Sequence, residues 1–156
     1  MCKRQSGRSH PTSARRRHLG RRSRCTSDAL WGAALGRTGN SLSDEQAPSI
    51  REILQAVAAG ARAIPEMGGA KVGDKTMVDA IIPFAEGIEK RLDSADPLAA
   101  VWAAAAAEVQ TAAEATANIS AQKGRARTHG DASIGAPDPG AISFSLLMRA
   151  AAATLS

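Results

Sequence analysis

A chain of 156 residues is long enough for one domain, and 44% of its residues are hydrophobic while only 3% are aromatic. Alanine supplies much of the apolar fraction and favours the α-helix more than any other residue, so the composition predicts an all-α protein. Two cysteines and the lack of any run of about 18 apolar residues argue against a disulfide scaffold and a membrane-spanning helix, and we expect a cytoplasmic protein.

The first 26 residues form a basic, low-complexity segment. Residues 1–27 contain nine Lys or Arg and no acid, whereas the rest of the chain contains eleven Lys or Arg and all fifteen Asp and Glu. Because this segment has almost no apolar side chain to bury, residues 1–26 are predicted to be a disordered arm. A folded domain is predicted over residues 27–156.

Three interpretations of this arm stay open. Arg-rich segments bind nucleic acid, but the acidic remainder of the chain argues against a nucleic-acid partner. The Arg- and Ser-rich, acid-free composition is also typical of a transit peptide. We favour a third interpretation, a wrongly assigned start or a shifted reading frame. No metal site is predicted here, because no common zinc spacing matches that of Cys2, His10, His18 and Cys25.

The first two helices are predicted from their caps and apolar stripes. Thr26 or Ser27 is the predicted cap of the first helix. Its apolar stripe consists of Leu30, Trp31, Ala34 and Leu35. The second helix begins with a capping box formed by Ser49 and Glu52, and its predicted end is Pro65.

The third and fourth helices are predicted within residues 73–94 and 95–120. The third has one apolar face, made of Met77, Ile81, Phe84, Ala85, Ile88 and Leu92. Asp96 is the predicted cap of the fourth helix, and Pro97 suits its first position. The alanine-rich sequence that follows favours close contacts between helices.

The fifth helix is predicted to begin with Asp138 as its cap and Pro139 as its first residue. Its predicted buried face consists of Leu146, Leu147, Ala150 and Ala151. A glycine-rich stretch from Lys123 to Pro137 separates it from the fourth helix. Irregular loops of this length are uncommon in compact domains, where they are usually lids, binding loops or disordered segments.

Two short motifs are candidates for binding chemistry. The segment from Gly68 to Thr76 looks like a phosphate-binding loop, but an aspartate interrupts its Gly-Lys pair, so a plain helix connection is the simpler interpretation. Asp138-Pro139-Gly140 offers the free N–H groups of a helix N-terminus to an anion, and Gly140 permits close approach; an ordinary N-cap is the alternative. Arg125 is either a second positive contact or a solvated surface charge.

These segments together resemble a known family. "GGAKVGDKTMVDAIIPFAE", "AAEATANISAQKGRA" and "GDASIGAPDPGA" are similar to the nucleotide-binding (DhaL) domain of dihydroxyacetone kinases, from about Thr26 onward. The resemblance implies an antiparallel helical barrel or bundle that binds ATP or ADP at one end, with the loop Lys123–Pro137 as a lid. Matched by position, the nucleotide-binding residues would be Thr26, Ser27, Gly68, Met77, Arg125, Asp138, Pro139 and Gly140. For Met77, a place in the core is the alternative.

The chain departs from the family before its first predicted helix. The family holds Mg ions with three aspartates in that region, whereas no acidic residue precedes Asp28 here. The family's first two helices have no counterpart either. We therefore expect an N-terminally incomplete DhaL domain in which neither metal ligands nor catalytic residues are identified.

The family implies a phosphotransferase of glycerol metabolism. Such a dihydroxyacetone (glycerone) kinase transfers a phosphoryl group from ATP to a short-chain ketose or triose, which a substrate-binding partner domain or subunit (DhaK type) holds. Related systems recharge bound ADP instead. Because phosphoryl transfer relies on metal electrostatics, the chain alone is expected to be inactive or incomplete. A catalytically inactive remnant or a regulatory helical binding module is the alternative.

Overall fold

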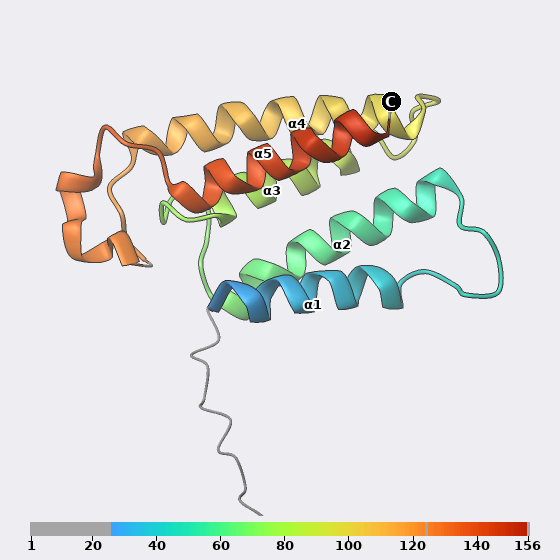
Figure 1. Cartoon of the computed structure of the whole chain (residues 1–156), viewed down its shortest axis with the longest axis horizontal. Helices are drawn as coiled ribbons and strands as arrows, with labels where there is room; N and C mark the ends of the chain where they lie inside the picture. Colours follow the sequence, from blue (N-terminus) through green and yellow to red (C-terminus); the bar gives the residue numbers. More distant parts are fainter. Residues whose placement is uncertain (1–25, 124, 156) are drawn as a thin grey trace, which may run out of the picture.

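The computed structural model describes residues 26–123 and 125–155, and within those ranges it contains helices and no strand (Figure 1). The all-α prediction is confirmed. The elements are α1 (Thr26–Asn40), α2 (Ile50–Gly68), α3 (Val78–Glu89), α4 (Leu98–Ala115), the 3-10 helices η1 (Thr116–Asn118) and η2 (Arg125–Ser133), and α5 (Pro139–Thr154). None of these helices is long and apolar enough to cross a membrane. Except for Thr26, the predicted arm lies outside the described residues.

The helices form two groups that meet in one core. α1 and α2 run antiparallel as a pair below α3, α4 and α5, and α3 packs against α2, α4 and α5 (Figure 1). Phe84 of α3 lies at the centre, with its ring edge-on to Trp102 at 5.2 Å and to Phe144 at 5.6 Å between centroids. Trp31 stacks on Phe144 at 5.9 Å, so aromatic contacts join α1 to α5.

Some predicted helix boundaries need correction. The capping box is confirmed, since the Ser49 hydroxyl accepts from the Glu52 N–H and the Glu52 carboxylate accepts from the Ser49 N–H. Pro65 does not end α2, which continues to Gly68. Its end is set by Gly69, whose left-handed backbone (φ +62°) lets its N–H donate to the Pro65 carbonyl, as in a common C-terminal cap. α1 begins at Thr26, so Thr26 and Ser27 lie in its first turn.

The two predicted Asp-Pro helix starts have different outcomes. At α5, the Asp138 cap with Pro139 in the first turn is confirmed. At α4, the helix begins at Leu98 with Pro97 as N-cap and no side-chain cap, so the prediction of an Asp96 cap is wrong. The Asp96 side chain is exposed.

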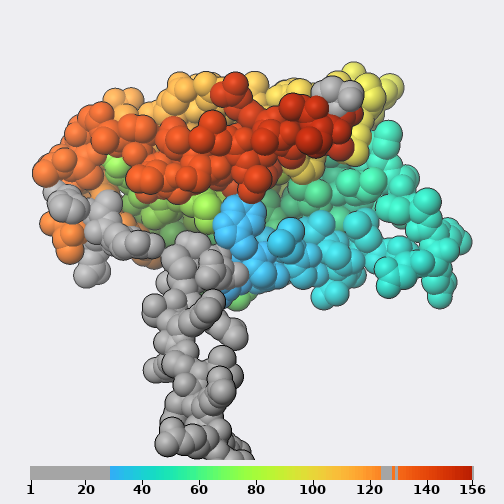
Figure 2. Space-filling view, in the orientation of Figure 1, coloured from blue at the N-terminus to red at the C-terminus, as the bar shows by residue number. Residues whose placement is uncertain are grey.

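The predicted buried face of α5 is also wrong. Leu146 and Leu147 are 57% and 49% exposed, whereas Phe144 and Met148 are buried. One side of α5, drawn in red, faces the viewer at the surface in Figure 2. α5 carries apolar residues around most of its circumference, so the helical period alone does not select a face. Phe144 turns inward because its ring packs on those of Phe84 and Trp31. On α1, Leu35 is likewise 68% exposed rather than part of the stripe.

Candidate functional site

The candidate site lies at one end of the bundle. There the connection between α2 and α3, the segment that holds η1 and η2, and the first turn of α5 come together (Figure 1). The start of α1 lies at the same end. Several residues predicted to bind a nucleotide belong to these segments, so their surroundings decide what the end of the bundle can bind.

Asp138 is held from both its backbone and its side chain. Its N–H donates to the Thr116 hydroxyl oxygen at 2.8 Å, and its carboxylate accepts from the Ala141 N–H at 2.8 Å. Burial raises the pKa of the Asp138 carboxyl, and nearby Asp79 adds to this; the N–H groups of Ala141 and Gly140 and the charge of Lys75 act in the opposite direction. The carboxylate therefore already occupies the N–H groups that a bare helix start would offer to an anion.

Gly140 packs directly on Met77. A Cβ added at Gly140 would lie 2.9 Å from the Asp138 Oδ2 and 3.2 Å from the Met77 Cβ. Met77 itself is partly buried against the core. The structure thus brings Met77, Asp138 and Gly140 together, and a side chain at position 140 would force the Asp138 carboxylate or Met77 to shift, a packing reason that the sequence did not reveal.

The turn before α3 contains two buried charged residues, Asp74 and Lys75, and the first turn of α3 contains a third, Asp79. The Asp79 carboxylate accepts from the Gly73 N–H at 2.6 Å and from the Thr76 N–H at 2.7 Å. The Asp74 carboxylate accepts from the Lys71 N–H at 2.9 Å. Carboxylates that accept backbone N–H groups fix a turn that lacks regular structure.

Sequence reasoning missed this buried cluster because it compared the segment with a phosphate-binding loop. A signal was present, since Thr76 and Asp79 have the spacing of a capping box. The Asp79 half of that box forms, while the Thr76 hydroxyl accepts from the Val78 N–H at 3.2 Å instead. The segment is therefore a structured turn with a buried polar interior.

The other predicted site residues lie at the ends of helices. Gly68 is exposed at the end of α2, and a Cβ there would lie 3.5 Å from the Leu30 side chain of α1. Within the described residues, Gly68 forms no hydrogen bond with Met77 or Asp138. Pro139 is exposed in the first turn of α5. For Thr26, Ser27 and Arg125, the structure describes the backbone alone. Thr26 and Ser27 lie at the start of α1, and Arg125 lies at the start of η2.

The loop predicted to be irregular has structure of its own. Residues 125–133 form η2, and Gly130 interrupts it with a φ of +47°. The Ser133 hydroxyl donates to the Gly130 carbonyl at 2.6 Å, and the Gly135 N–H donates to the Ala117 carbonyl at 2.8 Å. The first of these bonds is local, and the second ties the loop to η1, so hydrogen bonds shape this loop.

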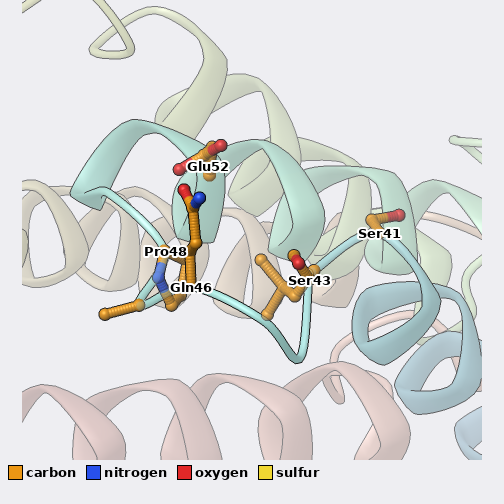
Figure 3. A pocket seen from close by; sticks show the side chains of 7 residues that line it. Ser41, Ser43, Gln46, Pro48 and Glu52 are labelled. Atoms are coloured by element: carbon orange, nitrogen blue, oxygen red, sulfur yellow. The ribbon is translucent and has the colours of Figure 1, made fainter.

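Two surface hollows lie away from these residues. One, of about 80 Å³, is lined by the α1–α2 connection and by Glu52 of α2 (Figure 3). A second lies between the start of α2 and the α3–α4 connection. The first is far smaller than the roughly 300–1,000 Å³ of small-molecule sites, and the second, of about 330 Å³, lies at the lower end of that range. Neither is lined by a predicted nucleotide-binding residue.

The described residues offer no metal centre. No group of three or more His, Cys, Asp or Glu side chains in that part of the chain is arranged to hold a metal ion. No catalytic step is therefore assigned to the Mg ions that the family resemblance implies.

Comparison with known proteins identifies the family. A family model described as the DAK2 domain matches residues 12–153. An L-erythrulose 1-kinase of Mycolicibacterium smegmatis is 48% identical over 125 residues, which are 80% of this chain and 22% of that protein. An L-erythrulose kinase of Pectobacterium atrosepticum is 40% identical over 131 residues, which are 84% of this chain and again 22% of the relative.

A shorter relative is the ADP-binding subunit DhaL of the PEP-dependent dihydroxyacetone kinase of Escherichia coli, which is 32% identical over 123 residues. These residues are 79% of this chain and 59% of the subunit. The chain thus spans about a fifth of the erythrulose kinases and less than two thirds of the DhaL subunit. The chain belongs to the DAK2-domain family, to which the predicted DhaL resemblance also pointed.

Proposed function

We propose that this chain is the nucleotide-binding part of a cytoplasmic dihydroxyacetone (glycerone)-type kinase. It binds ATP or ADP, and the phosphoryl group passes to a short-chain ketose or triose held by a DhaK-type partner domain or subunit. Relatives named as erythrulose kinases and as an ADP-binding DhaL subunit support both the nucleotide and the ketose.

The observation that carries the proposal is the contact among Met77, Asp138 and Gly140. Met77, whose side chain ends in a polarizable thioether, and the half-buried Asp138 both lie next to Gly140 at this end of the bundle, and a methionine side chain adapts to a flat purine ring. Because the Asp138 carboxylate already accepts the Ala141 N–H, this corner favours ribose hydroxyl donors over phosphates. The phosphates are expected to lie toward the start of α1, where Thr26 and Ser27 begin a helix.

The test is a titration of the purified chain with ADP and with ATP, up to millimolar concentration, followed by backbone amide NMR. Shifts that saturate and that cluster at residues 73–79 and 138–141 are expected. Weak affinity is expected, because the described residues hold no metal-binding cluster to neutralise phosphates. A chain whose spectrum is unchanged by either nucleotide contradicts the proposal.

A catalytically inactive remnant or regulatory module is the second candidate, because no acidic residue precedes Asp28 in this sequence. A coupled assay with Mg-ATP and a substrate-bearing subunit separates the two. We expect no turnover from the 156-residue chain, since lost electrostatic stabilisation costs several kcal/mol and each 1.4 kcal/mol is about tenfold in rate. Turnover within about tenfold of a full-length relative contradicts this expectation.

A further inference from the structure

Lys75 has an unusual place in the turn before α3. Its side chain is almost fully buried, and it is the single non-glycine residue with positive φ (+57°) among the residues that the structure describes. Residues with a side chain avoid this left-handed backbone, so such a conformation persists only where the surroundings hold it. The contacts of its ammonium group show what holds it.

The Lys75 ammonium joins two distant points of the chain. Its Nζ donates to the Ile119 carbonyl at 2.9 Å and to the Ser133 carbonyl at 2.5 Å. It forms no ion pair with a carboxylate in the described part of the chain. Because a buried ammonium is costly unless it is hydrogen-bonded, these two carbonyls fix it in place. One charged group thus fastens both ends of the segment 119–133.

The same turn holds that segment at two further points. The Gln122 N–H donates to the Asp74 carbonyl at 3.1 Å, and Lys123 contacts both the Asp74 carboxylate, at 3.8 Å, and the Gly69 carbonyl. The Ala121 N–H donates to the Ser133 hydroxyl at 3.0 Å and draws the ends of the segment together. Among these contacts, the Lys75 side chain is the one that holds both ends of the segment 119–133 at once.

We propose that Lys75 is a positioning residue for nucleotide binding. Its ammonium holds the segment 119–133, which includes Arg125, against the turn that ends at Met77. The inference rests on the proposed function, since it concerns how the same site is kept ready for ATP or ADP. Lys75 acts without touching the nucleotide, because its ammonium is directed to two backbone carbonyls.

The test compares Lys75→Met with Lys71→Met in the full chain. Lys71 lies in the same turn but is exposed, so its substitution removes one positive charge without loosening the segment. If the freed segment occupies the binding arrangement about one tenth of the time, the Kd for ADP rises about tenfold in Lys75→Met and stays unchanged in Lys71→Met. Amide exchange at Ala121 and Gln122 is expected to speed up by a similar factor without nucleotide, while the amides of α2 and α3 keep their protection.

The outcomes separate this inference from the proposed function. If the unchanged chain binds ADP and Lys75→Met binds it equally well, Lys75 is not a positioning residue while the proposed function stands. If the unchanged chain binds neither ADP nor ATP, both fail. Should Lys75→Met not fold, Lys75→Gln takes its place in both measurements, because its amide keeps N–H donors on a shorter stem and is expected to give an intermediate Kd. A Lys75→Gln Kd equal to that of the unchanged chain overturns the inference.

Discussion

The Asp-Pro pair stands before a helix twice in this chain, at opposite ends of the bundle, with different results (Figure 1). At α5 the Asp138 carboxylate accepts from the Ala141 N–H, and the side chain is half-buried. At α4 the Asp96 side chain is exposed, and the helix has no side-chain cap. The local signal for a helix start is the same in both places.

The surroundings make the difference. The Asp138 N–H is held by Thr116, a buried residue of η1, and the second residue after Asp138 is Gly140, which packs on Met77. The matching residue at α4 is Leu98, which packs against the core. A cap therefore forms where tertiary contacts orient the aspartate, and the same dipeptide remains solvated where they do not. Four measurements test this difference between the two helix starts.

The largest effect is expected from Gly140→Ala. The added Cβ would lie 2.9 Å from the Asp138 Oδ2 and 3.2 Å from the Met77 Cβ, so the Asp138 carboxylate or Met77 must shift. Overpacking of this kind costs about 1–3 kcal/mol of unfolding free energy, measurable by urea denaturation. Gly36→Ala in α1 is the control, because nothing surrounds its added Cβ, and it should stabilise by up to about 1 kcal/mol. Equal effects at the two glycines would show that the start of α5 is not tightly packed.

Thr116→Val tests the contact that orients Asp138. Valine keeps the shape of the buried threonine but removes the oxygen that accepts the Asp138 N–H, and it leaves that donor unsatisfied. We expect a loss of about 1–2 kcal/mol in the same denaturation experiment. Thr111→Val, at an exposed position of α4, should change stability by less than about 0.5 kcal/mol. A Thr116→Val protein as stable as the Thr111→Val protein would contradict the role of Thr116.

The two helix starts also show how far the sequence alone can predict the structure. Alanine content and helical period were enough for the all-α class, and the capping box at Ser49 and Glu52 was predicted correctly. These features depend on residues within four positions of one another. The Asp96 cap failed because its outcome depends on neighbours from other helices, which a local pattern does not contain.

The same reasoning applies to the face of α5 and to the site. Phe144 is buried through rings on α1 and α3, which are distant in sequence, so the choice against Leu147 was not predictable from α5 itself. Within the site, Met77, Asp138 and Gly140 were proposed together on family resemblance, but their contact arises from tertiary packing, which the sequence does not show. Lys75 was not predicted to have a role, because its partners are backbone carbonyls, which every residue has and which no sequence pattern identifies.

A comparison of Asp138→Ala with Asp96→Ala tests the difference between the two helix starts directly. Removing the Asp138 carboxylate frees the Ala141 N–H, and loss of an N-cap costs typically about 1 kcal/mol. Removing the exposed Asp96 should change stability by less than about 0.5 kcal/mol. Thermal unfolding followed by circular dichroism measures both. If Asp96→Ala loses as much as Asp138→Ala, the two starts are equivalent in solution and the comparison fails.

The smallest expected effect is a pH dependence, measured as the difference in unfolding free energy between the unchanged chain and Asp138→Asn. Burial, with Asp79 nearby, raises the pKa of the Asp138 carboxyl above its ordinary value of 3.8, so in the window above that value the folded state binds more protons than the unfolded state. The advantage of the unchanged chain is then greatest below pH 3.8 and shrinks as the pH rises through the raised pKa.

Glu89→Gln serves as a control of opposite sign, because the hydrogen bonds from Arg62 lower the pKa of Glu89 below 4.5. The advantage that Glu89 confers is present above pH 4.5 and is lost as the pH falls. Two differences that change with pH in the same direction would show that the pKa of Asp138 is lowered, so that the hydrogen bonds from the Ala141 and Gly140 N–H groups outweigh its burial.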